Sequence, residues 1–154
     1  MRVVIASLIL TCVSACSGSS PAAPSPTIPT IAGQWTGTYS VTTCTLAGSA
    51  VGTTFCTNLG SGGPHVLTAQ QTAGALTGTL GIGAFNIPVT GTVDASNRVA
   101  VSGSGPLVAG ATLTLTTWSA LLGGNQLTGA MTFTILTSEP IGSATVSAGV
   151  TLQR

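Results

Sequence analysis

Residues 127–135 have the sequence LTGAMTFTI, in which apolar or small residues alternate with polar or small ones without a break. One face of this stretch carries the odd-numbered positions: Leu127, Gly129, Met131, Phe133 and Ile135. Successive side chains of a strand point to opposite faces, so this period of two predicts a half-buried β-strand and not a helix. Threonine suits the other face because it is a good strand former that carries no charge.

The same alternation recurs along the chain from residue 31 onward. It is clearest in GQWTGTYSV (33–41), FNIPVTGTV (85–93) and ATVSAGVTL (144–152). The short sequences TAG (72–74), DASN (94–97) and GGN (123–125) separate the runs and are typical of hairpin turns. The predicted strands are 34–43, 51–58, 65–71, 75–83, 85–93, 98–104, 111–122, 126–136 and 143–153.

Eight or nine strands joined by hairpins predict an all-β fold with an up-and-down antiparallel meander. A meander of this size protects its edge strands most simply by closing, so we expect a small closed barrel, with a two-sheet sandwich as the alternative. Many of the predicted strands are too short for an outer-membrane barrel, and threonine would face the lipid. We therefore expect the barrel not to span a membrane.

Three short motifs resemble known barrel families. GQWTGTY (33–39) resembles the G-x-W start of lipocalin-like barrels. GALTGTL (74–80) and TTWSALLGGNQLTGAMTF (116–133) are similar to avidin-type strands. The resemblance implies a small eight-stranded antiparallel barrel that holds one ligand at its open mouth. The polar ligand-binding positions of avidin have no matching residues here, so the resemblance implies no binding residue.

Charge is scarce in this chain. It has three basic residues, two acidic residues and one histidine, and only 3% of its residues are charged. Globular domains usually carry about a quarter charged residues. The surface must therefore be built from Thr, Ser, Gly, Asn and Gln, and neither nucleic acid nor a cation is an expected partner.

The N-terminus has the features of an export signal. Met1 and Arg2 precede VVIASLILTCVSA (3–15), which is shorter than the ~20 residues of a membrane-spanning helix and suits a signal peptide. The sequence VSAC (13–16) resembles the lipobox of bacterial lipoproteins. The resemblance implies cleavage after residue 15 and lipid attachment to Cys16. The alternative is an ordinary signal peptide, with Cys16 as a stray thiol.

Acylation would make the lipid bilayer the partner of the mature N-terminus, because two or more acyl chains anchor a protein stably. Ser17 follows the cysteine where an inner-membrane retention signal has Asp, which favours the outer membrane or the cell surface. Residues 16–31 hold four prolines and form the expected semi-rigid tether. The expected organisation is a signal peptide (1–15), this tether and a barrel domain (32–154).

Cys44 and Cys56 are the two cysteines that remain in the exported domain, and we expect them to form a disulfide. They would face each other on the first hairpin, with LAGSAVG (46–52) as its loop. Counting by twos from Trp35 places Cys44 on the face opposite Trp35 and Tyr39, unless a bulge intervenes. Two cysteines without nearby His or acidic partners make a poor zinc site, so no metal is expected.

Residues for catalysis are few. His65 follows the turn sequence SGGP, Asp94 lies in a turn, and Glu139 precedes Pro140. No paired carboxylates, phosphate-binding loop or G-x-S-x-G motif accompanies them. We therefore expect a protein that is not an enzyme and needs no cofactor.

Two non-enzymatic functions remain. One is a structural or surface lipoprotein with a filled core, which we favour because inward aromatic residues more often pack a core than line a pocket. The alternative is a binding module for a small apolar ligand in the barrel interior. The residues expected to line either the core or a ligand site are Trp35, Tyr39, Phe55, Phe85 and Phe133.

Trp118 interrupts the period of two. In ATLTLTTWSALL (111–122), Leu113 and Leu115 set the inward phase, which places Trp118 on the polar face. A bulge near TTW would turn Trp118 inward together with Ala120 and Leu122, and we favour this arrangement because barrels bend their long strands in this way. Otherwise the exposed indole would mark a contact surface.

Overall fold

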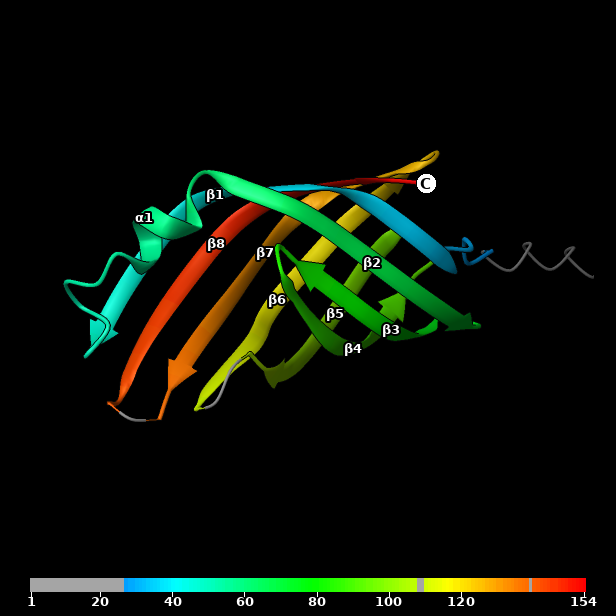
Figure 1. Ribbon diagram of the computed structural model, residues 1–154. Helices are drawn as coiled ribbons and strands as arrows, with labels where there is room; N and C mark the ends of the chain where they lie inside the picture. The colour runs from blue at the N-terminus through cyan, green and yellow to red at the C-terminus, as the bar shows by residue number, and fades with distance from the viewer. Residues whose placement is uncertain (1–26, 108–109, 139) are drawn as a thin grey trace, which may run out of the picture.

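The computed structural model describes residues 27–107, 110–138 and 140–154, and these fold into one antiparallel barrel with one short helix (Figure 1). The signal peptide, Cys16 and most of the expected tether lie outside the described residues. The elements are β1 (Gly33–Gly48), α1 (Phe55–Leu59), β2 (Gly62–Thr72), β3 (Ala75–Ile82), β4 (Phe85–Val93), β5 (Arg98–Pro106), β6 (Ala111–Gly123), β7 (Gln126–Thr137) and β8 (Gly142–Gln153).

Each strand pairs with the next along the chain, and β1 also pairs with β8 to close the barrel. The predicted meander and its closure are confirmed, and the sandwich alternative is wrong. The predicted strand 51–58 is also wrong, because this segment forms turns and α1. Gly52 there adopts a left-handed conformation (φ 84°), and the Thr53 hydroxyl donates to the Ala50 carbonyl, so local bonding replaces a strand ladder.

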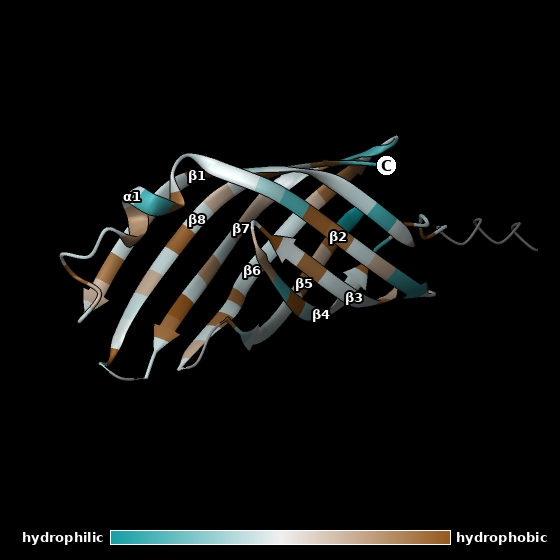
Figure 2. Cartoon of the chain, in the orientation of Figure 1, coloured by the Kyte–Doolittle hydropathy of each residue, from teal (hydrophilic) through white to brown (hydrophobic). Residues whose placement is uncertain are grey.

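The alternation of residues places apolar side chains inside the barrel, and the hydropathy of the strands changes in bands along their length (Figure 2). The inward faces predicted for 127–135 and 144–152 are confirmed. The largest fully buried side chains are Trp35, Trp118, Phe133, Ile31, Leu67, Leu80, Ile82, Ile87, Leu113, Leu115, Leu127 and Met131. Among the described residues no helix is both long and apolar enough to cross a membrane.

Two bulges change which residues of β1 and β6 face the barrel interior. Strand β6 carries one extra residue between Leu115 and Thr117 relative to β7, and Trp118 is 1% exposed as a result. The predicted bulge near TTW is confirmed, and the interpretation of Trp118 as a surface contact is wrong. Strand β1 carries an extra residue between Val41 and Thr43 relative to β8.

The bulge in β1 also changes the place of Cys44. After the extra residue, Cys44 is half-buried and packs against the apolar core. The expected position of Cys44 on the face opposite Trp35 and Tyr39 is therefore wrong, for the reason that the bulge shifts every later residue of β1 by one.

The two ends of the barrel differ. At one end, which we call the closed end, the fully buried Ile31 covers the core, and its backbone carbonyl accepts a 2.7 Å hydrogen bond from Trp35 Nε1. Gln71 fixes this segment by accepting from the Ile31 backbone N–H (2.7 Å) and donating to the Pro29 carbonyl (2.9 Å). The other end, which we call the open end, carries α1 and lies opposite the C-terminus (Figure 1).

Candidate functional site

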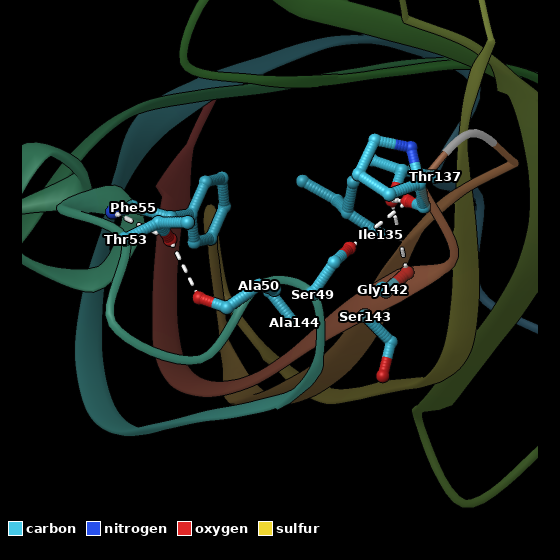
Figure 3. Close-up of a pocket in the computed structure, with 10 residues that line it drawn as sticks. Ser49, Ala50, Thr53, Phe55, Ile135, Thr137, Gly142, Ser143 and Ala144 are labelled. Atoms are coloured by element: carbon cyan, nitrogen blue, oxygen red, sulfur yellow. Dashed lines mark hydrogen bonds between the residues drawn. The ribbon is translucent and has the colours of Figure 1, made fainter.

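A pocket of about 270 Å³ lies at the open end. Its lining comes from three places: the segment after β1, the end of β7 with its turn, and the start of β8. The residues are Ser49, Ala50, Thr53, Phe55, Ile135, Thr137, Pro140, Gly142, Ser143 and Ala144. Figure 3 shows Phe55 and Ile135 on opposite sides of the opening, with their side chains directed toward one another.

The pocket exists because β1 is longer than its partner β2. The ladder between β1 and β2 ends at Ser40, whereas the ladder between β1 and β8 continues to Gly48. The remaining edge of β1 is covered by residues 49–61, which we call the roof and which return to the strand where Val41 N donates to Ser61 O (2.9 Å). Covering an edge in this way removes a site for unwanted strand pairing.

The roof is fixed at its first residue and again within α1. Ser49 bonds the β7–β8 turn twice, through its backbone N–H to the Ile141 carbonyl (3.0 Å) and through its hydroxyl to the Pro140 carbonyl (3.0 Å). The disulfide between Cys44 and Cys56 ties α1 to β1, with the two Cα atoms 5.8 Å apart. The predicted disulfide is confirmed, but it joins a strand to a helix and not two strands of a hairpin.

Three of the four hydroxyl groups among the lining residues donate their hydrogens to backbone carbonyls, and the fourth, on Ser143, points away from Phe55 and Ile135 (Figure 3). Thr137 donates to the Pro140 carbonyl (2.8 Å), as Ser49 does, and Thr53 donates to the Ala50 carbonyl (2.8 Å). A hydroxyl has one hydrogen and two lone pairs, so the oxygens of Ser49, Thr53 and Thr137 keep capacity to accept. The polar part of this pocket is therefore rich in acceptors.

The lining contains no charged side chain. The charged side chains of the described residues are Asp94, Arg98 and Arg154, and all three belong to the closed end. Asp94 accepts there from the backbone N–H of Arg98 (2.9 Å), which supports its predicted role in a turn. Arg154 lies over the Trp35 ring, 5.7 Å from its centroid. Glu139 lies outside the described residues.

His65 is buried in the barrel interior, where both of its ring nitrogens have partners. Nδ1 lies 2.7 Å from the Gly81 carbonyl and Nε2 lies 3.0 Å from Trp118 Nε1. An indole N–H can only donate and a carbonyl can only accept, so the ring must be neutral with its proton on Nδ1. Burial lowers the pKa of His65 from 6.5 to about 4, and the hydrogen bond to Gly81 acts in the opposite direction.

The ring of Tyr39 meets His65 edge-on, with the ring centroids 6.1 Å apart. Burial raises the pKa of Tyr39. Both groups are shielded from bulk water, because His65 is 0% exposed and Tyr39 only 5% exposed. The cluster of Tyr39, His65 and Trp118 is a packed interior layer of the barrel.

The five aromatic residues expected to line a core or a ligand site belong to the apolar core or pack against it, and they do not gather around the pocket. Trp35, Tyr39 and Phe133 are buried in the core. Phe55 and Phe85 are half-buried against it, and of the five only Phe55 lines the pocket. Within the described ranges, no three His, Cys, Asp or Glu side chains are close enough to hold a metal ion.

Sequence reasoning missed the pocket as a unit. The period of two predicts that Ile135 and Ala144 face inward. No motif or periodicity marks Ser49, Thr53 and Thr137 as pocket residues. The spacing of glycines around the roof was the available sign, because Gly48, Gly60 and Gly62 all have positive φ and break the strand pattern.

No known protein family, curated protein or solved structure matches this chain. The eight-stranded antiparallel barrel that the resemblance to lipocalin-like and avidin-type barrels implies is present, and the open-end pocket is assigned from its own geometry.

Proposed function

We propose that this chain is an exported lipoprotein of the bacterial cell envelope, anchored through Cys16, whose barrel is a non-enzymatic structural or surface module. The signal-like residues 1–15, the sequence VSAC (13–16) and the proline-rich segment that follows support the anchor. Ser17 after the cysteine supports the outer membrane as the destination.

The observation that carries this proposal is the difference between the two ends of the barrel. The chain enters at the closed end, where Ile31 and Trp35 are packed together. Ten residues separate Cys16 from the first described residue, Thr27, and an extended proline-rich chain spans about 3.1 Å per residue. Such a tether would hold the closed end within roughly 30 Å of the lipid and leave the open end accessible.

The surface of the open end supports a contact role. Val51 in the roof is 65% exposed and Ile141 in the β7–β8 turn is 81% exposed. The segments that carry these two side chains are joined by the hydrogen bonds of Ser49, and neighbouring apolar side chains that stay in water are typical of a surface that meets another molecule. The buried neutral state of His65 supports the non-enzymatic part of the proposal, since no other histidine is present to act as a base.

Cys16→Ser tests the anchor, and Cys12→Ser is its matched control because Cys12 lies inside the predicted signal peptide. The native chain and the Cys12→Ser chain should partition into detergent at the mature size, with the mass of attached acyl chains. The Cys16→Ser chain should be uncleaved or soluble. Recovery of a mature-sized Cys16→Ser chain in the detergent phase would refute the anchor, and soluble native protein would show an ordinary signal peptide.

A further inference from the structure

We propose that the open-end pocket binds a small uncharged amphipathic molecule with an apolar body and a head group that donates hydrogen bonds, such as an alcohol or a primary amide. This inference adds a binding site to the envelope role and does not depend on lipid attachment. It also differs from the expectation of a ligand in the barrel interior, because large buried side chains occupy the interior.

The walls of the pocket suit an apolar body. Phe55 and Ile135 face one another across the opening (Figure 3), and Ala144 adds a small apolar surface from β8. Phe55 is only half-buried, so its ring has free area that a ligand can cover. Removing that area from water supplies the driving force for binding.

The polar groups of the pocket select the head group. Ser49 and Thr137 both donate to the Pro140 carbonyl, and Thr53 donates to the Ala50 carbonyl. Their oxygens then offer lone pairs and have no free hydrogen. A ligand that donates a hydrogen bond is satisfied at these positions, whereas a ligand that can only accept leaves its own oxygen unpaired.

The absence of charge in the lining selects a neutral ligand. No lining residue could pair with a carboxylate or an ammonium group, and such an ion would lose hydration on entering. Glu139, the sequence neighbour of Pro140, is the one acidic residue of the β7–β8 connection and therefore needs a control of its own.

The size of the pocket sets the size of the ligand. A volume of about 270 Å³ equals roughly nine water molecules at ~30 Å³ each, which suits a ligand of about ten non-hydrogen atoms. A ligand of this size is expected to bind with a Kd of roughly 10 μM to 1 mM.

The test uses the Cys16→Ser chain starting at position 16, which keeps the tether and the whole described barrel and carries no lipid. Amide chemical shifts are followed by NMR at pH 7 during titration with 3-phenylpropan-1-ol. The three comparison probes are its methyl ether, which cannot donate, and the charged 3-phenylpropanoate and 3-phenylpropylammonium. We expect the alcohol to shift amides of residues 49–55, 135–137 and 142–144, and to bind about fivefold more tightly than the ether, the effect of one hydrogen bond.

Two substitutions form a matched pair. Phe55→Ala should weaken binding of the alcohol at least fivefold, because it removes the apolar wall. Phe85→Ala removes the other half-buried phenylalanine, which does not line the pocket, and should leave binding unchanged. If Phe55→Ala disturbs the roof, Ala144→Leu serves instead, since its added carbons fill the pocket from β8 and should block the alcohol.

Four results would overturn the proposal. They are the absence of saturable shifts with the alcohol, shifts confined to residues outside the pocket, equal binding of alcohol and ether, and tighter binding of either ion. Glu139→Gln should leave the affinity for the alcohol unchanged, and loss of binding in that variant would also contradict a neutral site.

Discussion

Trp118 Nε1 donates a 3.0 Å hydrogen bond to His65 Nε2 across the interior of the barrel. Trp118 belongs to β6 and His65 to β2, and three strands separate these two on either side of the closed sheet. The bond therefore joins opposite walls. It depends on the bulge before Trp118, without which the indole would point outward.

The neutral state of His65 predicts a loss of stability in acid. Unfolding restores a pKa near 6.5, whereas the folded protein holds it at about 4. Between these values the unfolded chain binds more protons, so the free energy of unfolding is fully retained above pH 6.5 and falls as the pH drops toward 4. The expected loss is about 3 kcal/mol, measured by urea unfolding across this range.

His65→Gln is the control for that experiment, because it removes the titrating group while the carboxylates of the chain still titrate. The groups that face His65 are the Tyr39 phenol, the Gly81 carbonyl and the Trp118 indole, and none of these gains a charge in this pH range. The same decline in both proteins would show that His65 is not its cause.

Trp118→Phe should leave His65 Nε2 without a donor in the interior. An unpaired buried polar atom costs about 1–3 kcal/mol, and we expect the free energy of unfolding at pH 7 to fall by at least that amount. Nε2 would also become free to accept a proton, so the acid transition should move to a higher pH. A destabilised variant with an unchanged acid transition would contradict the hydrogen bond and leave only a loss of packing.

The disulfide should stabilise the roof more than the rest of the barrel. Replacing Cys44 and Cys56 by Ala opens a loop with a sequence separation of 12 residues, and the expected cost is about 2–3 kcal/mol in the chain-entropy model. Hydrogen exchange should accelerate in residues 49–61 and change little in β3 and β4. Uniform acceleration throughout the barrel would show that the bridge does not act on the roof.

Gly129 should not tolerate a side chain. A Cβ atom at this position in β7 would overlap the backbone of Ser119 and Ala120 in β6, so Gly129→Ala should cost about 1–3 kcal/mol through a forced backbone shift. Gly123→Ala is the matched control, because a Cβ there meets no other atom within 4 Å. Thermal unfolding of the two variants compares them directly, and equal stability would contradict the close approach of β6 and β7.

The period of two in the sequence predicts the inward faces of β4, β7 and β8 because no bulge interrupts these strands. The period of two gives the wrong face for Cys44, because an extra residue in β1 shifts every later side chain by one position. A Thr-Thr pair at 42–43 precedes Cys44 just as another precedes Trp118, so the sequence held a sign of this bulge. Sequence alternation also suggested a strand at 51–58. The pocket could not be foreseen, because the position of the roof depends on hydrogen bonds between Ser49 and the β7–β8 turn, which is distant in the sequence.

Side chains fill and close the barrel interior, so that any binding takes place at its open end. Nitrogen NMR of the His65 ring detects this closure, since the state of each ring nitrogen reports its partner and its access to water. We expect a protonated Nδ1 and an unprotonated Nε2 at pH 7, with no change on acidification to about pH 5, because the pKa of His65 lies at about 4. A ring that exchanges between tautomers, or that titrates near 6.5, would mean that water reaches the interior and that the barrel is not closed.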